Sequence, residues 1–101
     1  MIARMWSGKV PDKHADGFQR HLLGTGIRDY RQQAGCVEVR LFCREVEGWA
    51  VFLLLSLWTS MDEIRAYAGS TPEVAVLYPE DESFELVADL RVTHYEVLEL
   101  W

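Results

Sequence analysis

Positive charge and long apolar runs are both scarce in this sequence. Its 101 residues include 10 basic and 16 acidic side chains, which gives a net charge of −6. Phosphate binding needs a basic face, so we expect neither a nucleic-acid partner nor attraction to an anionic membrane. The longest apolar run, Trp49 to Leu55, has the length of a strand and is far too short to span a membrane.

Cysteine is also rare, and familiar catalytic motifs are missing. Cys36 and Cys43 lie seven residues apart on one expected strand, so they face opposite sides and cannot form a disulfide with each other. The N-terminal stretch MIARMWSGKV lacks the charged and apolar regions of a signal peptide. We therefore expect a cytoplasmic protein with free thiols. No glycine-rich phosphate loop, CxxC pair or nucleophile elbow is present.

Apolar residues make up half of the chain and suffice for one domain, residues 1–101. Their spacing predicts the order strand, helix, strand, strand, helix, strand, which is the ferredoxin-like pattern. The predicted class is α+β, with a four-stranded antiparallel sheet and both helical segments on one face. The predicted strands are Met1 to Trp6, Cys36 to Arg44, Trp49 to Leu57 and Arg91 to Leu98, and the predicted helices are an interrupted one from Pro11-Asp12 to Gln33, Met61 to Ala68, and a turn within Pro72 to Tyr78.

Turn and cap residues predict where these elements begin and end. Ser7-Gly8 should end the first strand, and Gly48 should supply a positive φ in a hairpin turn. The expected helix caps are Asp12, Thr25 and either Ser60 or Thr59, and the expected helix stops are Gly35 and Gly69.

The third strand is apolar on both faces. Trp49, Val51, Leu53 and Leu55 alternate on one side, and Ala50, Phe52 and Leu54 alternate on the other. Helices cover only one face of a ferredoxin-like sheet, so the other face would be a large apolar patch. We expect a homodimer in which two sheets pack face to face.

Charged residues recur on the first and last strands, which are neighbours in this fold. Arg4 and Trp6 share one face of the first strand, and His94 and Glu96 share one face of the last. Arg4, His94 and Glu96 could form a cluster that supplies a general base or orients an anion. The alternative is a satisfied ion pair at a sheet end or in the dimer interface. The sequence does not place His94 on either side of the sheet.

Aromatic residues gather around the end of the third strand. Trp58 falls on the same face as Phe52 and Leu54, and its expected partners are Tyr67 and Tyr78. These rings could line a cleft between helix and sheet that suits a flat aromatic ligand, or they could form an ordinary core contact.

The remaining polar groups suggest solvated surfaces. His14 and His21 lie two helical turns apart, about 10 Å, which is too far to share a metal ion. We expect both to be solvated. Glu80, Asp81 and Glu82 should form an acidic, solvated turn, so no metal site is predicted.

The element order and the segment SLWTSMDEIRAYAGS, a strand-end Trp followed by a capped helix, resemble the antibiotic biosynthesis monooxygenase family of the dimeric α+β barrel superfamily. YPED and RVTHYEVL are similar to features of its small uncharacterised members. The resemblance implies a ligand cleft between helices and sheet. Some members oxygenate polycyclic aromatic polyketides without metal or flavin. Others degrade haem with an Asn on the first strand, the strand-end Trp and a His on the next helix.

Only the Trp of that haem set is matched here, by Trp58. The sequence contains no Asn, and the helix after Trp58 contains no His, so we expect no cofactor. The resemblance then implies a cofactor-independent monooxygenase, an oxidoreductase acting on a small planar phenol or quinol. Candidate catalytic residues are His94 and Arg4, and candidate substrate-binding residues are Trp58, Tyr67, Trp6 and Tyr78.

Two alternatives belong to other classes. One is a homodimer of the same fold that binds a small ligand or is associated with stress, without catalysis. The other is a purely structural dimer whose cleft is filled by Trp58, Tyr67 and Phe18. A cavity too small for an aromatic ring would favour the structural dimer.

Overall fold

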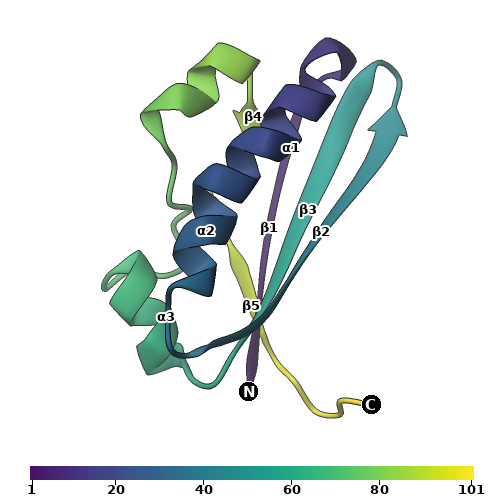
Figure 1. Ribbon diagram of the computed structural model, residues 1–101. Helices are drawn as coiled ribbons and strands as arrows, with labels where there is room; N and C mark the ends of the chain where they lie inside the picture. The colour runs from purple at the N-terminus through teal and green to yellow at the C-terminus, as the bar shows by residue number, and fades with distance from the viewer.

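A computed structural model describes every residue from Met1 to Trp101. The chain forms an antiparallel sheet with all helices on one of its faces (Figure 1). None of these helices has the length and apolarity needed to cross a membrane. The strands are β1 (Ile2–Pro11), β2 (Cys36–Val46), β3 (Trp49–Trp58), β4 (Val87–Ala88) and β5 (Thr93–Glu96), and the helices are α1 (Ala15–Gly24), α2 (Gly26–Arg31) and α3 (Met61–Ala68), with 3₁₀ turns η1 (Asp12–His14) and η2 (Pro79–Phe84).

The sheet has the order β2-β3-β1-β4, and β5 pairs with the same edge of β1 as β4 does. This confirms the predicted α+β, ferredoxin-like class. The predicted last strand, Arg91 to Leu98, corresponds to β5, and β4 before it is an additional short strand that was not predicted. Asp89 leaves the ladder between β4 and β5, where its N–H donates to the Ser7 carbonyl at 2.9 Å. Its own carbonyl accepts from the Trp6 indole at 3.2 Å, which holds the chain in this detour.

Strand β1 is longer than predicted, because Ser7 and Gly8 do not end it. Gly8 pairs with Phe52 on one side and with Ala88 on the other. The Trp6 ring lies over Gly8, so a Cβ added there would stand 2.7 Å from Trp6 Cη2. The glycine is thus a site of close approach inside a strand and not a turn residue.

Three of the predicted end signals are confirmed. The Ser60 hydroxyl accepts from the Glu63 N–H at 3.3 Å and caps α3. Gly48 and Gly69 take positive φ values of 86° and 87° at the hairpin turn and at the end of α3.

Two predicted caps and one predicted helical turn are wrong. Asp12 makes no side-chain cap hydrogen bond, and Thr25 donates back to the His21 carbonyl at 2.8 Å. The stretch from Pro72 to Tyr78 forms no helix. Pro72 and Glu73 form a single turn, in which the Val74 N–H donates to the Thr71 carbonyl at 3.0 Å, and Val74 then makes an isolated antiparallel bridge with Arg91.

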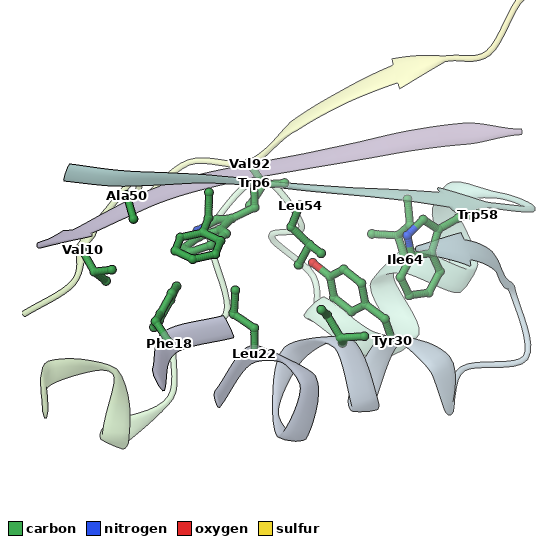
Figure 2. Close-up of a cluster of buried hydrophobic side chains, with 12 residues drawn as sticks. Trp6, Val10, Phe18, Leu22, Tyr30, Ala50, Leu54, Trp58, Ile64 and Val92 are labelled. Carbon is green, nitrogen blue, oxygen red and sulfur yellow. The ribbon is translucent and has the colours of Figure 1, made fainter. Parts of the chain in front are cut away.

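The core lies between the sheet and the helical layer (Figure 2). Phe18 and Leu22 of the predicted helix stripe are buried in it, and Phe18 meets Phe52 edge-on at 5.3 Å. Twelve buried residues form the cluster: Trp6, Val10, Phe18, Leu22, Ile27, Tyr30, Ala50, Phe52, Leu54, Trp58, Ile64 and Val92. The opposite face of the sheet has no second layer, and Phe42 and Leu53 remain 47% and 38% exposed.

Candidate functional site

Arg4 is the most unusual side chain of the core. It lies on the helix side of β1 with 1% of its surface exposed. Its Nε donates to the Tyr30 hydroxyl at 3.1 Å, and Nη1 donates to the Pro72 carbonyl at 2.7 Å. No carboxylate lies within ion-pair distance of it. A buried charge is normally paired, so this guanidinium lacks a counter-ion.

His94 is bound to Arg4. The two residues are direct partners in the β1–β5 register, and Nη1 lies 2.9 Å from His94 Nε2. A guanidinium can only donate, so Nε2 accepts and the imidazole is neutral with its proton on Nδ1. Burial, and then the Arg4 charge, lower the pKa of His94 below its usual value, which agrees with a neutral ring. His94 therefore lies on the helix side of the sheet.

Glu96 does not join this pair. It is the register partner of Ile2, is exposed, and forms no ion pair. The predicted three-membered cluster is thus reduced to Arg4 and His94, because β5 places Glu96 two register pairs away, opposite Ile2.

A small cavity lies beside Arg4, between the sheet and the helical layer. Its volume is about 30 Å³, enough for one or two water molecules. Four of the predicted site residues, Arg4, Trp6, Tyr67 and Tyr78, line it, whereas Trp58 and His94 do not. The other lining residues are Phe18, Leu22, Gly26, Tyr30, Leu54, Val76, Leu77 and Asp81.

Trp58 stands behind this cavity, in the core. It is fully buried, and its indole N–H donates to the Ser56 hydroxyl at 2.8 Å. Its ring meets Tyr30 edge-on at 5.5 Å (Figure 2). The structure thus gives Trp58 the place of a packing anchor that supports the wall formed by Tyr30 and Tyr67.

Tyr67 and Tyr78 form a hydrogen-bonded chain that ends at Asp29. The hydroxyls of Tyr67 and Tyr78 are 3.3 Å apart, and Tyr78 donates to Asp29 Oδ2. Burial raises the pKa of Tyr67 to about 12. Burial, and next the hydrogen bond to Asp29, raise the pKa of Tyr78 as well. Both hydroxyls therefore keep their protons at neutral pH.

Asp81 lines the cavity and is bound to His21, contrary to the prediction that both are solvated. His21 Nε2 lies 2.6 Å from Asp81 Oδ1, and both side chains are nearly buried. Asp81 Oδ2 also accepts the Tyr78 N–H at 2.9 Å, so the Asp81 carboxylate is engaged away from Arg4. His14 is only half-buried and contacts Glu85 at 2.9 Å.

Some of these missed residues had a signal in the sequence. His21 follows Phe18 by three positions and borders the buried stripe of α1, and Asp81 follows Tyr78 by three, the spacing of a capping contact. Nothing in the sequence pairs Asp29 with Tyr78, because their contact depends on how the long segment after α3 returns to α2.

A wider groove of about 430 Å³ lies outside this site, against α2 and the start of β2. Its wall holds no aromatic ring and no buried charge. Its lining residues are Leu23, Ile27, Arg31, Cys36, Val37, Glu38, Val39 and Leu41. The cavity around Arg4 is therefore the candidate site.

Several solved structures share this fold. A provisionally assigned antibiotic biosynthesis monooxygenase from Deinococcus radiodurans is similar with a TM-score of 0.69 and 18% identity, over 100% of this chain and 96% of its own. One from Bacillus cereus has a TM-score of 0.68 and 14% identity, over 100% and 94%. No protein-family model and no curated protein matches the sequence.

A third similar structure is a mutant of MhuD with two manganese protoporphyrin IX molecules bound per active site. Its TM-score is 0.68 at 15% identity, over 100% of this chain and 98% of its own. At such identities the likeness shows the fold. This chain has the monooxygenase-like fold that the sequence resemblance implied.

Proposed function

We propose that this protein is a cofactor-independent monooxygenase that acts on a small planar phenol or quinol in the cleft between helices and sheet. The observation that carries the proposal is Arg4, a buried guanidinium without a counter-ion at the edge of an aromatic cavity. A phenolate oxygen would supply the missing negative charge and form a charge-assisted hydrogen bond. The rings of Trp6, Tyr30 and Tyr67 would contact the flat faces of the substrate.

The proposed reaction needs no external reductant. A phenolate is electron-rich and gives one electron to O₂, and the resulting radical pair joins at a ring carbon that carries hydrogen. The hydroperoxide then loses water, so that one phenol and one O₂ yield one quinone and one water. In this reading Arg4 favours the ionised phenol, and neutral His94 positions Arg4 through their hydrogen bond.

The cleft must open for this chemistry. A benzene-sized ligand occupies an apolar cavity of about 150 Å³, several times the volume present beside Arg4. Val76 and Leu77 cover the cavity while being 37% and 45% exposed themselves, so little packing holds them down. We infer that Val76 and Leu77 move outward to admit the ring, while Tyr78 keeps its contacts with Asp29 and Asp81.

Haem does not fit this site, because no His lines the cavity and α3, the helix after Trp58, offers no His to bind iron. We therefore assign no step to haem, although the MhuD mutant binds a manganese porphyrin within the same fold.

The small cavity also favours the second candidate, a purely structural dimer with a permanently filled cleft. The two functions predict different effects of aromatic anions on protein stability. If the cleft binds such an anion, a hundredfold excess over the dissociation constant raises the free energy of unfolding by about 2.7 kcal/mol, whereas a permanently filled cleft gives no such increase.

Oxygen uptake and thermal stability should be measured with a panel of phenols and hydroquinones. We expect both uptake and stabilisation for the wild type, and loss of both for Arg4→Met. The matched control is Arg40→Met, which removes an exposed arginine from β2. Stabilisation without uptake would indicate a non-catalytic binding protein. Neither effect with any ligand would favour the structural dimer.

A further inference from the structure

The direction of the hydrogen bonds around Tyr78 is determined by chemistry. Each tyrosine hydroxyl has one proton, and an ionised carboxylate can only accept. Tyr78 gives its proton to Asp29 Oδ2, so the proton between the two hydroxyls must come from Tyr67. The donors thus run from the cavity wall outward, from Tyr67 to Tyr78 to Asp29.

We propose that Tyr67, Tyr78 and Asp29 form a proton relay that removes the hydroxyl proton of a phenol bound beside Arg4. This inference rests on the proposed function insofar as that function brings a phenol into the cleft. Tyr67 lines the cavity, and Arg4 Cζ lies 6.0 Å from the centre of its ring. A phenol bound in this cavity beside Arg4 would therefore lie next to Tyr67, whose hydroxyl has a free lone pair.

Three protons move, each by one step. The substrate O–H breaks and its proton binds Tyr67 Oη, while the Tyr67 proton passes to Tyr78 Oη and the Tyr78 proton passes to Asp29 Oδ2. Both tyrosines end neutral, the substrate ends as the phenolate, and Asp29 ends as the carboxylic acid. No electron leaves or enters, and the negative charge moves from Asp29 to a site beside Arg4.

Asp29 suits the outer end of this path. It does not line the cavity, and 27% of its side chain is exposed, so it can return the proton to water. Its other oxygen, Oδ1, accepts from Arg28 at 3.2 Å, which fixes the carboxylate in place. The raised pKa values of Tyr67 and Tyr78 keep both hydroxyls protonated, so they pass protons on while Asp29 acts as the base.

The relay stays assembled while a ligand is bound. Tyr78 is held at two points, because its hydroxyl donates to Asp29 of α2 and its N–H donates to Asp81. Val76 and Leu77 can therefore move outward to admit the ring while Tyr78 remains in contact with Asp29.

The test uses 4-nitrophenol, which is colourless when neutral and yellow when ionised. The neutral probe is mixed with the protein in mildly acidic buffer in a stopped-flow instrument. Binding is followed by quenching of tryptophan fluorescence, and ionisation by the yellow absorbance. For the wild type we expect colour to appear together with binding. For Tyr78→Phe and Asp29→Asn we expect the colour to appear in a separate phase, at least tenfold slower than the quenching of the same variant.

Asp29→Asn keeps an oxygen that accepts from Tyr78 but is not basic, so a purely structural role of Asp29 would leave the colour phase fast. Imidazole in the buffer should restore the fast phase in this variant. The control is Tyr95→Phe, which changes an exposed tyrosine of β5. Colour at the wild-type rate in both relay variants would overturn the relay and leave the proposed function standing.

Absence of any probe binding to the wild type would overturn the relay together with the binding site. Because ionisation of the probe requires no oxygen chemistry, a protein that ionises the probe but takes up no oxygen would keep the relay and lose the monooxygenase activity.

Discussion

At the scale of single residues, the buried indole N–H of Trp58 has one hydrogen-bond acceptor, a serine hydroxyl. Ser56 and Trp58 are both fully buried, and the Ser56 hydroxyl is the acceptor of the indole N–H. Ser56→Ala leaves that N–H unpaired in an apolar site and should lower the free energy of unfolding by about 1–3 kcal/mol. In urea unfolding, the double variant with Trp58→Phe should cost less than the two single changes added together. Additive costs would mean that the hydrogen bond contributes nothing.

His94 makes stability depend on pH. Its pKa in the folded protein lies below the ordinary value of 6.5, so below that pH the unfolded chain binds a proton that the folded chain does not. The free energy of unfolding should therefore fall as pH drops through about 6.5, and no such effect remains above it. Protonation would also deprive Arg4 of an acceptor.

The comparison variant is His94→Gln, whose side-chain oxygen can accept from Arg4 without titrating. Relative to this variant, the wild type should lose stability between neutral pH and about pH 5 in urea unfolding. The other histidines are common to both proteins and cancel. A stability difference that stays constant with pH would show that the folded and unfolded states hold His94 with the same proton affinity.

At the scale of elements, two glycines should respond in opposite ways to alanine. A Cβ at Gly8 in β1 would lie 2.7 Å from Trp6 Cη2 and 3.0 Å from Leu86 Cδ1, so Gly8→Ala should cost about 1–3 kcal/mol. A Cβ at Gly24, the last residue of α1, would meet nothing within 4 Å. Gly24→Ala should therefore raise stability by about 0.4–1 kcal/mol. Urea midpoints measure both, and equal shifts would contradict the close approach at Gly8.

Elements with strong periodicity were predictable, and long-range contacts were not. The strand pair around Gly48 and the helix from Ser60 to Gly69 followed from alternation, capping and a positive φ. The predicted end of the first strand at Gly8 was wrong, because the sequence does not distinguish a strand glycine that lies under a neighbouring ring from a turn glycine. The path of the chain after the turn at Pro72 depends on the bridge between Val74 and Arg91, which no local pattern encodes.

The candidate site follows the same division. Arg4, Trp6, Tyr67 and Tyr78 were found because charged and aromatic residues stand out on predicted strands and helices, and the structure brings them to one cavity. His21, Asp29 and Asp81 were missed, since each makes a side-chain hydrogen bond with a partner at least 49 positions away in the sequence. Trp58 lies one layer deeper than a cavity wall, a distinction that alternation along a strand cannot make.

At the scale of the whole molecule, the open face of the sheet remains to be covered. Phe42 of β2 and Leu53 of β3 are register partners on this face, and both are exposed. On its rim, Lys9 Nζ lies 4.4 Å from the centre of the Trp49 ring. An apolar centre with a polar rim is the usual composition of a protein interface. We predict that a second copy of this chain covers the face around a two-fold axis.

In such an arrangement each changed residue occurs twice in one interface. Phe42→Glu combined with Leu53→Glu would bury four like charges against apolar surface. The cost of removing these charges from water should exceed the free energy that holds the dimer together. Native mass spectrometry should show a dimer for the wild type and a monomer for this variant. Leu23→Glu is the control, because Leu23 is exposed on α1 in the helical layer. A dimer that survives the sheet substitutions but dissociates with Leu23→Glu would place the interface on the helices. A monomeric wild type would mean that this apolar sheet face stays in contact with water.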